Sequence, residues 1–331
     1  MQINFRAKKL IFLILFSSLL MSDERFKNTN NMPNLKSFGD FLKWSLNRKK
    51  PTPIKIELSD EWKNFSDQKE NYLIWIGHST FLINIEGTVV LTDPVFSDRA
   101  SPVKIAGPKR IIPPAMQITD LPEIDVVTVS HNHYDHLDIP SLKKLSAKNP
   151  KTLFLVPKGD QKLLNRKGIK NTKEFLWWEN IEIKGAKFTF TPTQHWSARG
   201  LADRNKSLWG GWFMTFPNFK SFHAGDSGYS KDFQDTKARL GNPDLSLIPI
   251  GAYAPRWFMK ANHVNPEEAL RVALDLGSKK NYAMHWGTFS LTDEETLEPP
   301  TLLRKALAKK GLSESFFEIL MPGQIKKVAF D

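Results

Sequence analysis

Four side chains of the kinds that bind metal ions lie within six residues: His131, His133, Asp135 and His136. In an extended segment, residues two apart point to the same side, so His131 and His133 can bind one ion together. Asp135 and His136 would face a second ion once the chain bends. Imidazole and carboxylate ligands without a thiolate suit zinc or a neighbouring borderline metal. The alternative is a polar loop with a chance cluster, but three of the chain's eight histidines fall here, directly after the apolar segment 124–129. The pattern therefore predicts metal binding.

Three further polar residues each follow a short apolar run of their own: His195, Asp226 and His285. Open α/β sheets place their sites at the carboxyl ends of strands. Any one of these residues, taken alone, is more often a satisfied polar group of the core. Together with His131 they occupy four equivalent positions, which predicts that they complete a two-metal site.

The surrounding pattern is that of an α/β protein. We expect strands at 72–76, 80–85, 88–91, 124–129, 152–156, 175–178, 187–191, 208–216, 221–224, 245–250 and 282–284. Helices are expected at 140–147, at 161–165, after Asn265 and at 302–310. The third has an Asn265 cap, Pro266 at its first position and Glu268 to close a capping box, and Gly277 ends it. The segment 96–114, rich in Pro, Gly, Lys and Arg, is expected to be a long loop.

The length and composition limit the number of domains and the kinds of binding partner that we expect. The 331 residues suffice for one large domain or two small ones. With 47 Lys and Arg against 35 Asp and Glu, the net charge is +12, which favours nucleic acid, anionic substrates or a phospholipid surface. Cysteine is absent, so neither a disulfide nor a thiolate ligand can form, and the redox compartment stays open.

The N-terminus has the pattern of a targeting segment. Arg6, Lys8 and Lys9 precede an apolar run at 10–21, interrupted only by Ser17 and Ser18. This pattern is typical of a signal sequence or signal anchor, whereas a bilayer span needs about 20 apolar residues. A buried N-terminal helix is the alternative. We predict membrane association through an uncleaved segment 1–30, with export left open, followed by a basic arm or linker at 31–69 and a catalytic domain at 70–331.

The order of ligands in 131–136 resembles the H-x-H-x-D-H signature of the metallo-β-lactamase fold. Longer blocks resemble the N-acylphosphatidylethanolamine-hydrolysing phospholipase D family, at 75–78, 91–94, 107–110, 194–196, 224–226, 249–253, 255–260, 285–288 and 297–300. The resemblance covers about residues 70 to 325. It implies an αββα sandwich, in which two packed mixed β-sheets carry helices on their outer faces.

The resemblance also implies a set of site residues. One zinc ion would be bound by His131, His133 and His195, and a second by Asp135, His136 and His285, with Asp226 and a hydroxide between them. Asp93 and His78 would support ligands from behind. Asp135 and His263 are the candidate catalytic residues, and His263 would protonate the leaving oxygen. The candidate substrate contacts, of which the tryptophans would line an acyl groove, are Tyr134, Trp196, Trp257 and Asn262.

The implied activity is zinc-dependent hydrolysis of N-acylphosphatidylethanolamine to N-acylethanolamine and phosphatidic acid, with two Zn²⁺ ions per chain. The alternatives are another hydrolase on this scaffold, such as a lactonase or a nuclease-type phosphodiesterase, and a membrane-bound regulator without activity. Seven intact ligand positions argue against the regulator. The expected partners are a phospholipid substrate, a membrane surface and a second copy of the chain in a homodimer; nucleic acid is not expected.

Overall fold

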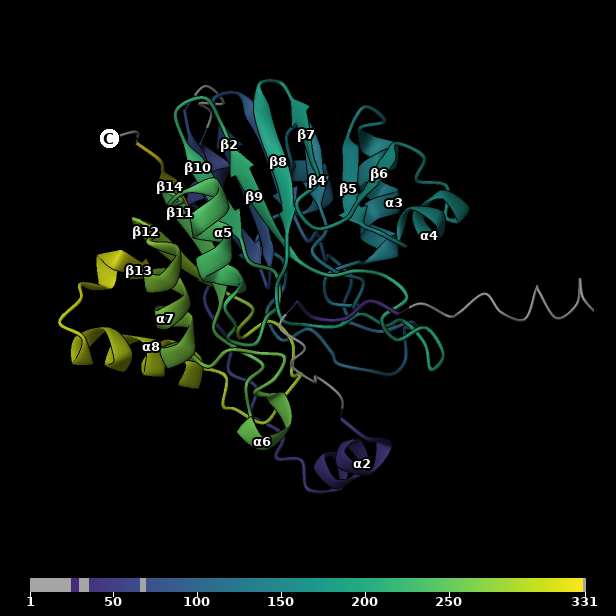
Figure 1. Cartoon of the computed structure of the whole chain (residues 1–331), viewed down its shortest axis with the longest axis vertical. Coiled ribbons are helices and arrows are strands. Elements are labelled where there is room, and N and C mark those ends of the chain that lie inside the picture. Colours follow the sequence, from purple (N-terminus) through teal and green to yellow (C-terminus); the bar gives the residue numbers. More distant parts are fainter. Residues whose placement is uncertain (1–24, 30–35, 66–69, 330–331) are drawn as a thin grey trace, which may run out of the picture.

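Two mixed β-sheets pack face to face, with helices on their outer faces (Figure 1). The computed structural model describes residues 25–29, 36–65 and 70–329, and each sheet has seven strands within these ranges. The αββα sandwich expected from the sequence is therefore confirmed. The predicted targeting run at 10–21 lies outside the described residues.

The first sheet has the order β14-β1-β2-β3-β4-β5-β6. Its antiparallel half contains β14, β1, β2 and β3, and its parallel half continues from β3 to β6. The bounds are β1 Tyr72–Gly77, β2 Thr80–Ile85, β3 Thr88–Thr92, β4 Val126–Thr128, β5 Leu153–Pro157, β6 Thr172–Phe175 and β14 Ile325–Lys327.

The second sheet has the order β13-β12-β11-β10-β9-β8-β7. It too is half parallel, from β13 to β10, and half antiparallel, from β10 to β7. The bounds are β7 Asn180–Ile183, β8 Ala186–Thr191, β9 Gly211–Thr215, β10 Lys220–His223, β11 Leu245–Pro249, β12 Lys280–Met284 and β13 Phe317–Glu318.

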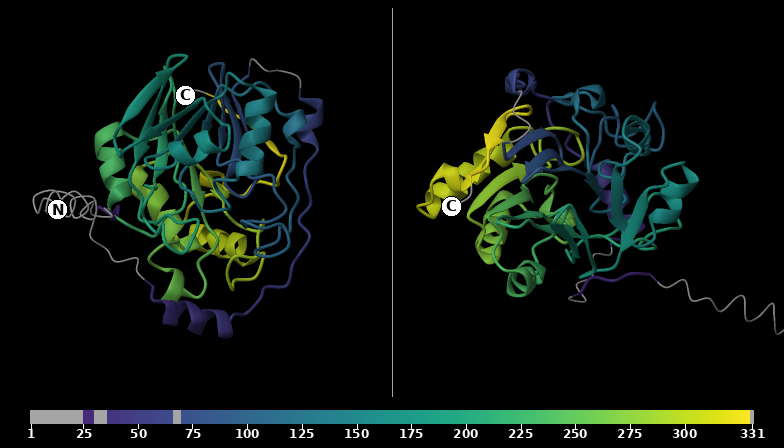
Figure 2. Two further views of the ribbon diagram at one scale, coloured as in Figure 1. Left: turned by 90° about the vertical axis from the view of Figure 1, so that its right-hand side faces the viewer. Right: turned by 90° about the horizontal axis from the view of Figure 1, so that it is seen from above.

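Helices cover both outer faces and one end of the sandwich (Figures 1 and 2). Helices α3 and α4 lie beside the first sheet, and α5, α7 and α8 beside the second, while α2 and α6 lie at the end where the long loops gather. The bounds are α2 Phe38–Leu46, α3 Ile139–Lys148, α4 Gln161–Arg166, α5 Asp232–Leu240, α6 Arg256–Met259, α7 Pro266–Leu276 and α8 Glu298–Lys309, with short 3-10 helices η1 Glu61–Asn64, η2 Ile118–Asp120 and η3 Glu314–Phe316.

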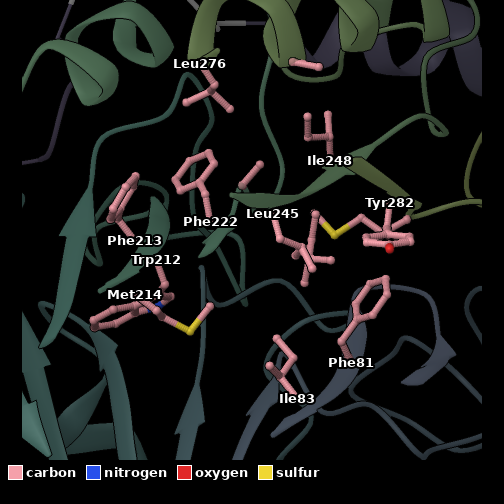
Figure 3. Close-up of a cluster of buried hydrophobic side chains, with 14 of the residues drawn as sticks. Phe81, Ile83, Trp212, Phe213, Met214, Phe222, Leu245, Ile248, Leu276 and Tyr282 are labelled. Carbon is pink, nitrogen blue, oxygen red and sulfur yellow. The ribbon is translucent and has the colours of Figure 1, made fainter. Parts of the chain in front are cut away.

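Alternation along the strands separates two cores. In β1, Leu73 and Trp75 join the cluster between the sheets, whereas Tyr72, Ile74 and Ile76 join the cluster that packs under α3 and α4. This is the period-2 pattern of a strand buried on both faces. Figure 3 shows the cluster between the sheets, with side chains of β2 facing those of the second sheet, and Leu276 of α7 covering the outer side.

The local signals for α7 are confirmed. Asn265 Oδ1 accepts from the Glu268 amide at 2.8 Å, and Glu268 Oε2 accepts from the Asn265 amide at 3.1 Å. Gly277 ends the helix with a φ of 64°, a left-handed conformation that glycine adopts without strain. Helix α8, in contrast, begins at Glu298, earlier than the predicted residue 302, because Pro299 and Pro300 are accommodated in its first turn.

The predicted strand at 175–178 is wrong. Strand β6 ends at Phe175, and the chain turns at Trp178, whose φ is 73°. The Trp178 amide donates to Phe190 O at 2.6 Å, and the Arg239 guanidinium lies 4.2 Å from the centre of its ring. Trp178 therefore belongs to a turn that contacts β8 and α5, and not to a strand.

The region predicted as a basic arm contains a helix and contacts the rest of the protein. Trp44 of α2 stacks on Phe258 with ring centres 5.1 Å apart, and Arg48 Nη2 donates to Ser290 O at 2.8 Å. Further along, the Ser59 amide donates to Pro322 O at 2.8 Å. The division of the chain at residue 70 stays a prediction. Among the described residues, no helix is both long and apolar enough to cross a bilayer.

Candidate metal centre

The loop after β4 turns so that its ligands face two directions. His133 O accepts from the amides of His136 (3.1 Å) and Leu137 (2.8 Å), which bends the chain before α3. Arg199 Nη1 donates to Asn132 O and to Leu137 O, each at 2.8 Å, and so ties the two ends of the loop together. Arg199 was not among the residues singled out from the sequence, because a side chain that bonds only to main-chain carbonyls leaves no motif.

His131, His133 and His195 form the first ligand group. His133 Nδ1 lies 2.9 Å from His131 Nε2 and 3.3 Å from His195 Nε2. His195 follows β8 of the second sheet, whereas the other two follow β4 of the first sheet. The group therefore spans the two sheets.

Hydrogen bonds behind the rings fix which nitrogen is left for a ligand. His195 Nδ1 lies 3.0 Å from Asn262 O, and because a carbonyl only accepts, Nδ1 carries the hydrogen and Nε2 presents its lone pair. Ser130 Oγ donates to Asp93 Oδ2 at 2.6 Å and thus accepts from His131 Nδ1 at 3.0 Å. Nε2 of His131 is freed in the same way.

His78, Asp135, His136 and His285 form a second group. His136 Nδ1 donates to Asp93 Oδ2 at 2.7 Å, so its Nε2 is available. Asp135 Oδ2 lies 3.4 Å from His285 Nε2 and 3.6 Å from His136 Nε2. His78 Nε2 lies 3.1 Å from the same oxygen. Asp93 therefore contacts the far nitrogen of a candidate ligand, whereas His78 belongs to the second group itself.

Asp226 faces both groups. Its Oδ2 lies 3.1 Å from His285 Nε2 and 3.2 Å from His136 Nε2 on one side. On the other side it lies 3.8 Å from His195 Nε2 and 3.9 Å from His131 Nε2. This carboxylate therefore lies between the two ligand groups.

The carboxylates make the centre favourable for positive charge. Burial alone would raise the pKa of Asp226, but His136 and His285 hold it well below its ordinary value. Burial opposes protonation of His285 too, yet Asp226 and Asp135 raise the pKa of that ring to about 9. His133, where burial dominates, has its pKa lowered to about 4. A divalent cation meets this preference and needs neutral imidazoles as its ligands.

Unsatisfied buried atoms support the same interpretation. Among the described residues, Nε2 of His136, Nε2 of His285 and Oδ1 of Asp226 have no hydrogen-bond partner. Buried polar atoms are nearly always paired, so three such atoms at one point call for a missing partner. Close approach without hydrogen-bond geometry is what the ligands of a shared cation show. The residues present therefore fit metal ions.

A cavity of about 640 Å³ opens over this centre. His133, Asp135 and Asp226 lie at its base, and its apolar wall comes from separate parts of the chain. That wall consists of Phe41 and Trp44 of α2, Trp196, Leu201, Phe258, Met259 and Leu291. The volume is in the usual range for small-molecule sites. The wall residues from α2 were missed because nothing local in the sequence links them to the other wall residues, which lie between 152 (196 − 44) and 250 (291 − 41) positions away.

The candidate catalytic and substrate residues are placed unevenly. His263 lines the cavity with Nδ1 3.8 Å from Asp226 Oδ2, and burial lowers its pKa to about 4. Trp196 and Asn262 line the cavity as well. Tyr134 instead stacks under Arg199, 4.0 Å from its guanidinium carbon, and donates to Arg199 O at 2.8 Å. Trp257 lies on the outer surface, 47% exposed, with Lys43 Nζ 5.2 Å from its ring centre.

Comparison with known proteins agrees with this architecture. Residues 88–286 match the family model described as the Beta-lactamase superfamily domain. A metallo hydrolase from Ignicoccus hospitalis superposes with a TM-score of 0.60 at 20% identity, over 79% of this chain and 99% of that one. An isothiocyanate hydrolase from Delia radicum gut bacteria gives 0.62 at 21% identity, over 78% and 99%. Fold and site thus define a metal-dependent hydrolase of the metallo-β-lactamase fold.

More similar relatives narrow the class. N-acyl-phosphatidylethanolamine-hydrolyzing phospholipase D 1 of Caenorhabditis elegans is 40% identical over 275 residues, 79% of this chain and 77% of the relative. The mitochondrial enzyme of that name from Saccharomyces cerevisiae is 41% identical over 78% of this chain, which spans 58% of its length. The chain belongs to the family of N-acylphosphatidylethanolamine-hydrolysing phospholipases D.

Proposed function

We propose that the protein is a di-zinc phosphodiesterase that hydrolyses N-acylphosphatidylethanolamine to N-acylethanolamine and phosphatidic acid. The observation that carries the proposal is Asp226, which faces two ligand groups at the base of a largely apolar cavity. An apolar wall suits an acyl chain, and a two-metal base suits a phosphodiester. The names of the relatives support the same substrate.

The donor set supports zinc. His131, His133 and His195 would hold one ion, Asp135, His136 and His285 the other, and Asp226 both. Ligands 2.0–2.1 Å from a tetrahedral zinc ion are about 3.3 Å apart, close to the 2.9 and 3.3 Å between the converging ring nitrogens of the first group. Two such ions supply Lewis acidity and a water of lowered pKa for attack on a phosphodiester.

The side chains around the cavity position the reacting lipid. Lys36 and Arg204 line the cavity and bring positive charge to it, which suits the anionic diester. A P–O bond forms to the attacking water oxygen as the P–O bond to N-acylethanolamine breaks, and the leaving oxygen takes up a proton. His263, which lies beside Asp226 on the cavity side, would deliver that proton. Because burial lowers the pKa of its ring to about 4, this role requires the bound anionic diester to raise that pKa.

A membrane surface is the proposed partner. Exposed apolar side chains lie at the end of the sandwich that carries the cavity: Phe41 (47%), Leu42 (46%) and Leu46 (78%) on α2, Trp257 (47%) on α6, and Leu201. Lys36 and Lys43 lie near Trp257. Apolar and basic side chains together suit an anionic lipid interface. The predicted N-terminal anchor would add to this contact.

The membrane proposal has its own test. Leu42→Glu places a charge on the exposed face of α2, where Leu42 is 46% exposed, and should reduce co-flotation with vesicles of phosphatidylcholine and phosphatidic acid. Leu274→Glu is the matched control, because Leu274 is similarly exposed (44%) on α7. Equal losses in the two variants, or none in either, would overturn the contact through α2.

The substrate proposal is tested by lipid mass spectrometry. The zinc-loaded protein is incubated in H₂¹⁸O with N-acylphosphatidylethanolamine, with phosphatidylethanolamine and with a long-chain lactone. We expect N-acylethanolamine together with ¹⁸O-labelled phosphatidic acid from the first, and no product from the Asp226→Ala variant. Faster turnover of the lactone would favour the lactonase alternative. Label in N-acylethanolamine rather than in phosphatidic acid would refute attack at phosphorus.

A further inference from the structure

The segment 25–29, here termed the N-terminal strap, lies against the loops that carry the metal centre (purple in Figure 1). The Phe26 amide donates to Asn205 O at 2.9 Å, and Arg25 Nη1 donates to Arg204 O at 2.7 Å. At the other end of the strap, Thr29 Oγ1 donates to Asp232 Oδ1 at the start of α5. The strap is thus fastened to two separate segments of the domain.

Asn28 is the buried residue of the strap, with 7% of its surface exposed. Its Oδ1 accepts from the backbone amide of His195 at 3.1 Å and from Trp209 Nε1 at 3.0 Å. The Trp209 indole also donates to Thr193 O at 3.0 Å. If the Asn28 side-chain oxygen is removed, the Trp209 indole can still donate to Thr193 O. The backbone amide of His195 loses the side-chain oxygen that accepts from it.

This contact acts on a ligand position. The ring of His195 is held through Nδ1 by Asn262 O, and its main chain is held by Asn28. Because the ring and the backbone of His195 are both held, its Nε2 stays 3.3 Å from His133 Nδ1. The two nitrogens must keep such a short separation if they are to bind the same ion. Groups that orient a metal ligand typically contribute 10- to 100-fold in metal affinity.

We propose that Asn28 is a positioning residue of the metal centre, so that the strap completes the first ligand group from the N-terminal side. The inference rests on the proposed function only in that His195 holds a metal ion; it needs no particular substrate. It further implies that the catalytic unit cannot be cut at residue 70, because Asn28 belongs to it.

The test compares full-length variants. Asn28→Leu has a similar size but no acceptor, and Asn28→Asp keeps an acceptor oxygen. Thr29→Ala is the matched control, because it removes a contact of the strap that reaches α5 and no ligand. Zinc affinity is measured by competition with a chromophoric chelator. The melting temperature of each variant is measured as well, after a chelator has removed the metal.

We expect zinc affinity to fall by about 10- to 100-fold in Asn28→Leu, to stay close to wild type in Asn28→Asp, and to be unchanged in Thr29→Ala. Wild-type affinity in Asn28→Leu, or equal losses in the Leu and Asp variants, would overturn the inference. The inference would also be overturned if lower stability of the metal-free protein accounted for the loss of zinc affinity in Asn28→Leu. That would be the case if Thr29→Ala showed the same fall in melting temperature together with the same loss of affinity.

Two further outcomes are distinguishable. If Asn28→Leu does not fold, Asn28→Ser is tested in its place. The serine hydroxyl lies on a shorter side chain and is therefore further from the His195 amide, so the same loss of zinc affinity is expected. If the wild-type protein binds no zinc, the proposed two-metal function fails and this inference fails with it. A zinc-loaded wild type with no effect of Asn28→Leu removes the positioning role alone.

Discussion

Asp160 is a buried carboxyl group whose ionisation should lower stability as the pH rises. It is 1% exposed, and its Oδ1 accepts from Asn132 Nδ2 at 3.0 Å and from Ser207 Oγ at 2.8 Å. Its Oδ2 has no hydrogen-bond partner among the residues that the structure describes. Burial raises the pKa of Asp160 to about 7, with the hydrogen bonds from Ser207 and Asn132 opposing it.

The sign follows from the two states. In the unfolded chain an aspartate has a pKa of about 3.9, so the folded state binds this proton more tightly. The stabilising contribution is complete below about pH 4 and is lost as the pH rises through 7. Between pH 5 and pH 8 the difference amounts to roughly 2 to 3 kcal/mol, at about 1.4 kcal/mol per pKa unit.

Asp160→Asn tests this magnitude. The neutral amide keeps an oxygen for Asn132 and Ser207, and it has no ionisation to lose. Urea unfolding at pH 5 and pH 8, at fixed zinc, gives the stability of both proteins. The free energy of unfolding of the variant, relative to that of the wild type, should be about 2 to 3 kcal/mol larger at pH 8 than at pH 5. A stability difference that is constant with pH, or that changes in the opposite direction, would refute the reasoning.

Three more variants probe the centre and its cavity. Asp226→Ala removes the carboxylate that faces both ligand groups, so metal content should drop below two zinc ions per chain and nearly all activity should disappear; metal analysis checks this, and an active metal-free preparation would contradict it. His263→Ala should reduce turnover of N-acylphosphatidylethanolamine by about 10²–10⁴-fold with both metals retained; a nitrophenyl phosphodiester should be affected far less, and equal losses would make His263 a positioning residue. Trp44→Ala removes the stack on Phe258 and part of the cavity wall, so KM for long-chain substrates should rise with little change in kcat, as substrates of two chain lengths would show; an unchanged KM would place the acyl chain elsewhere.

The metal centre could be predicted from sequence because its signals are local. The proposed ligands are histidines and aspartates in the loops that follow apolar runs, and the strands bring these loops to one end of the sandwich. Helix α7 was predictable for the same reason, since Asn265 and Glu268 form its capping box within four residues. Where a short segment contains both the element and its stop signal, no tertiary information is needed.

The remainder depends on contacts between distant residues. Asn28 and His195 are 167 positions apart, and no local pattern in the strap announces that contact. Helix α5 was missed because only Asp232, Phe233 and Thr236 of its nine residues are buried, too few for a clear apolar period. The strand predicted at 175–178 failed since its aromatic side chains pack around a turn, where β propensity has no meaning.

The pairing of β1 with β14 bears on how the protein is synthesised. Tyr72 pairs with Lys327 and Ile74 with Ile325, so a strand made early waits for a partner that is translated 255 residues later (327 − 72). At about 5 to 20 residues per second, that wait lasts roughly 12 to 50 s. During this interval one edge of β1 offers unpaired backbone groups to any neighbouring chain. A nascent chain in this state would be a natural client for a ribosome-associated chaperone, and slowing its elongation should increase aggregation rather than yield.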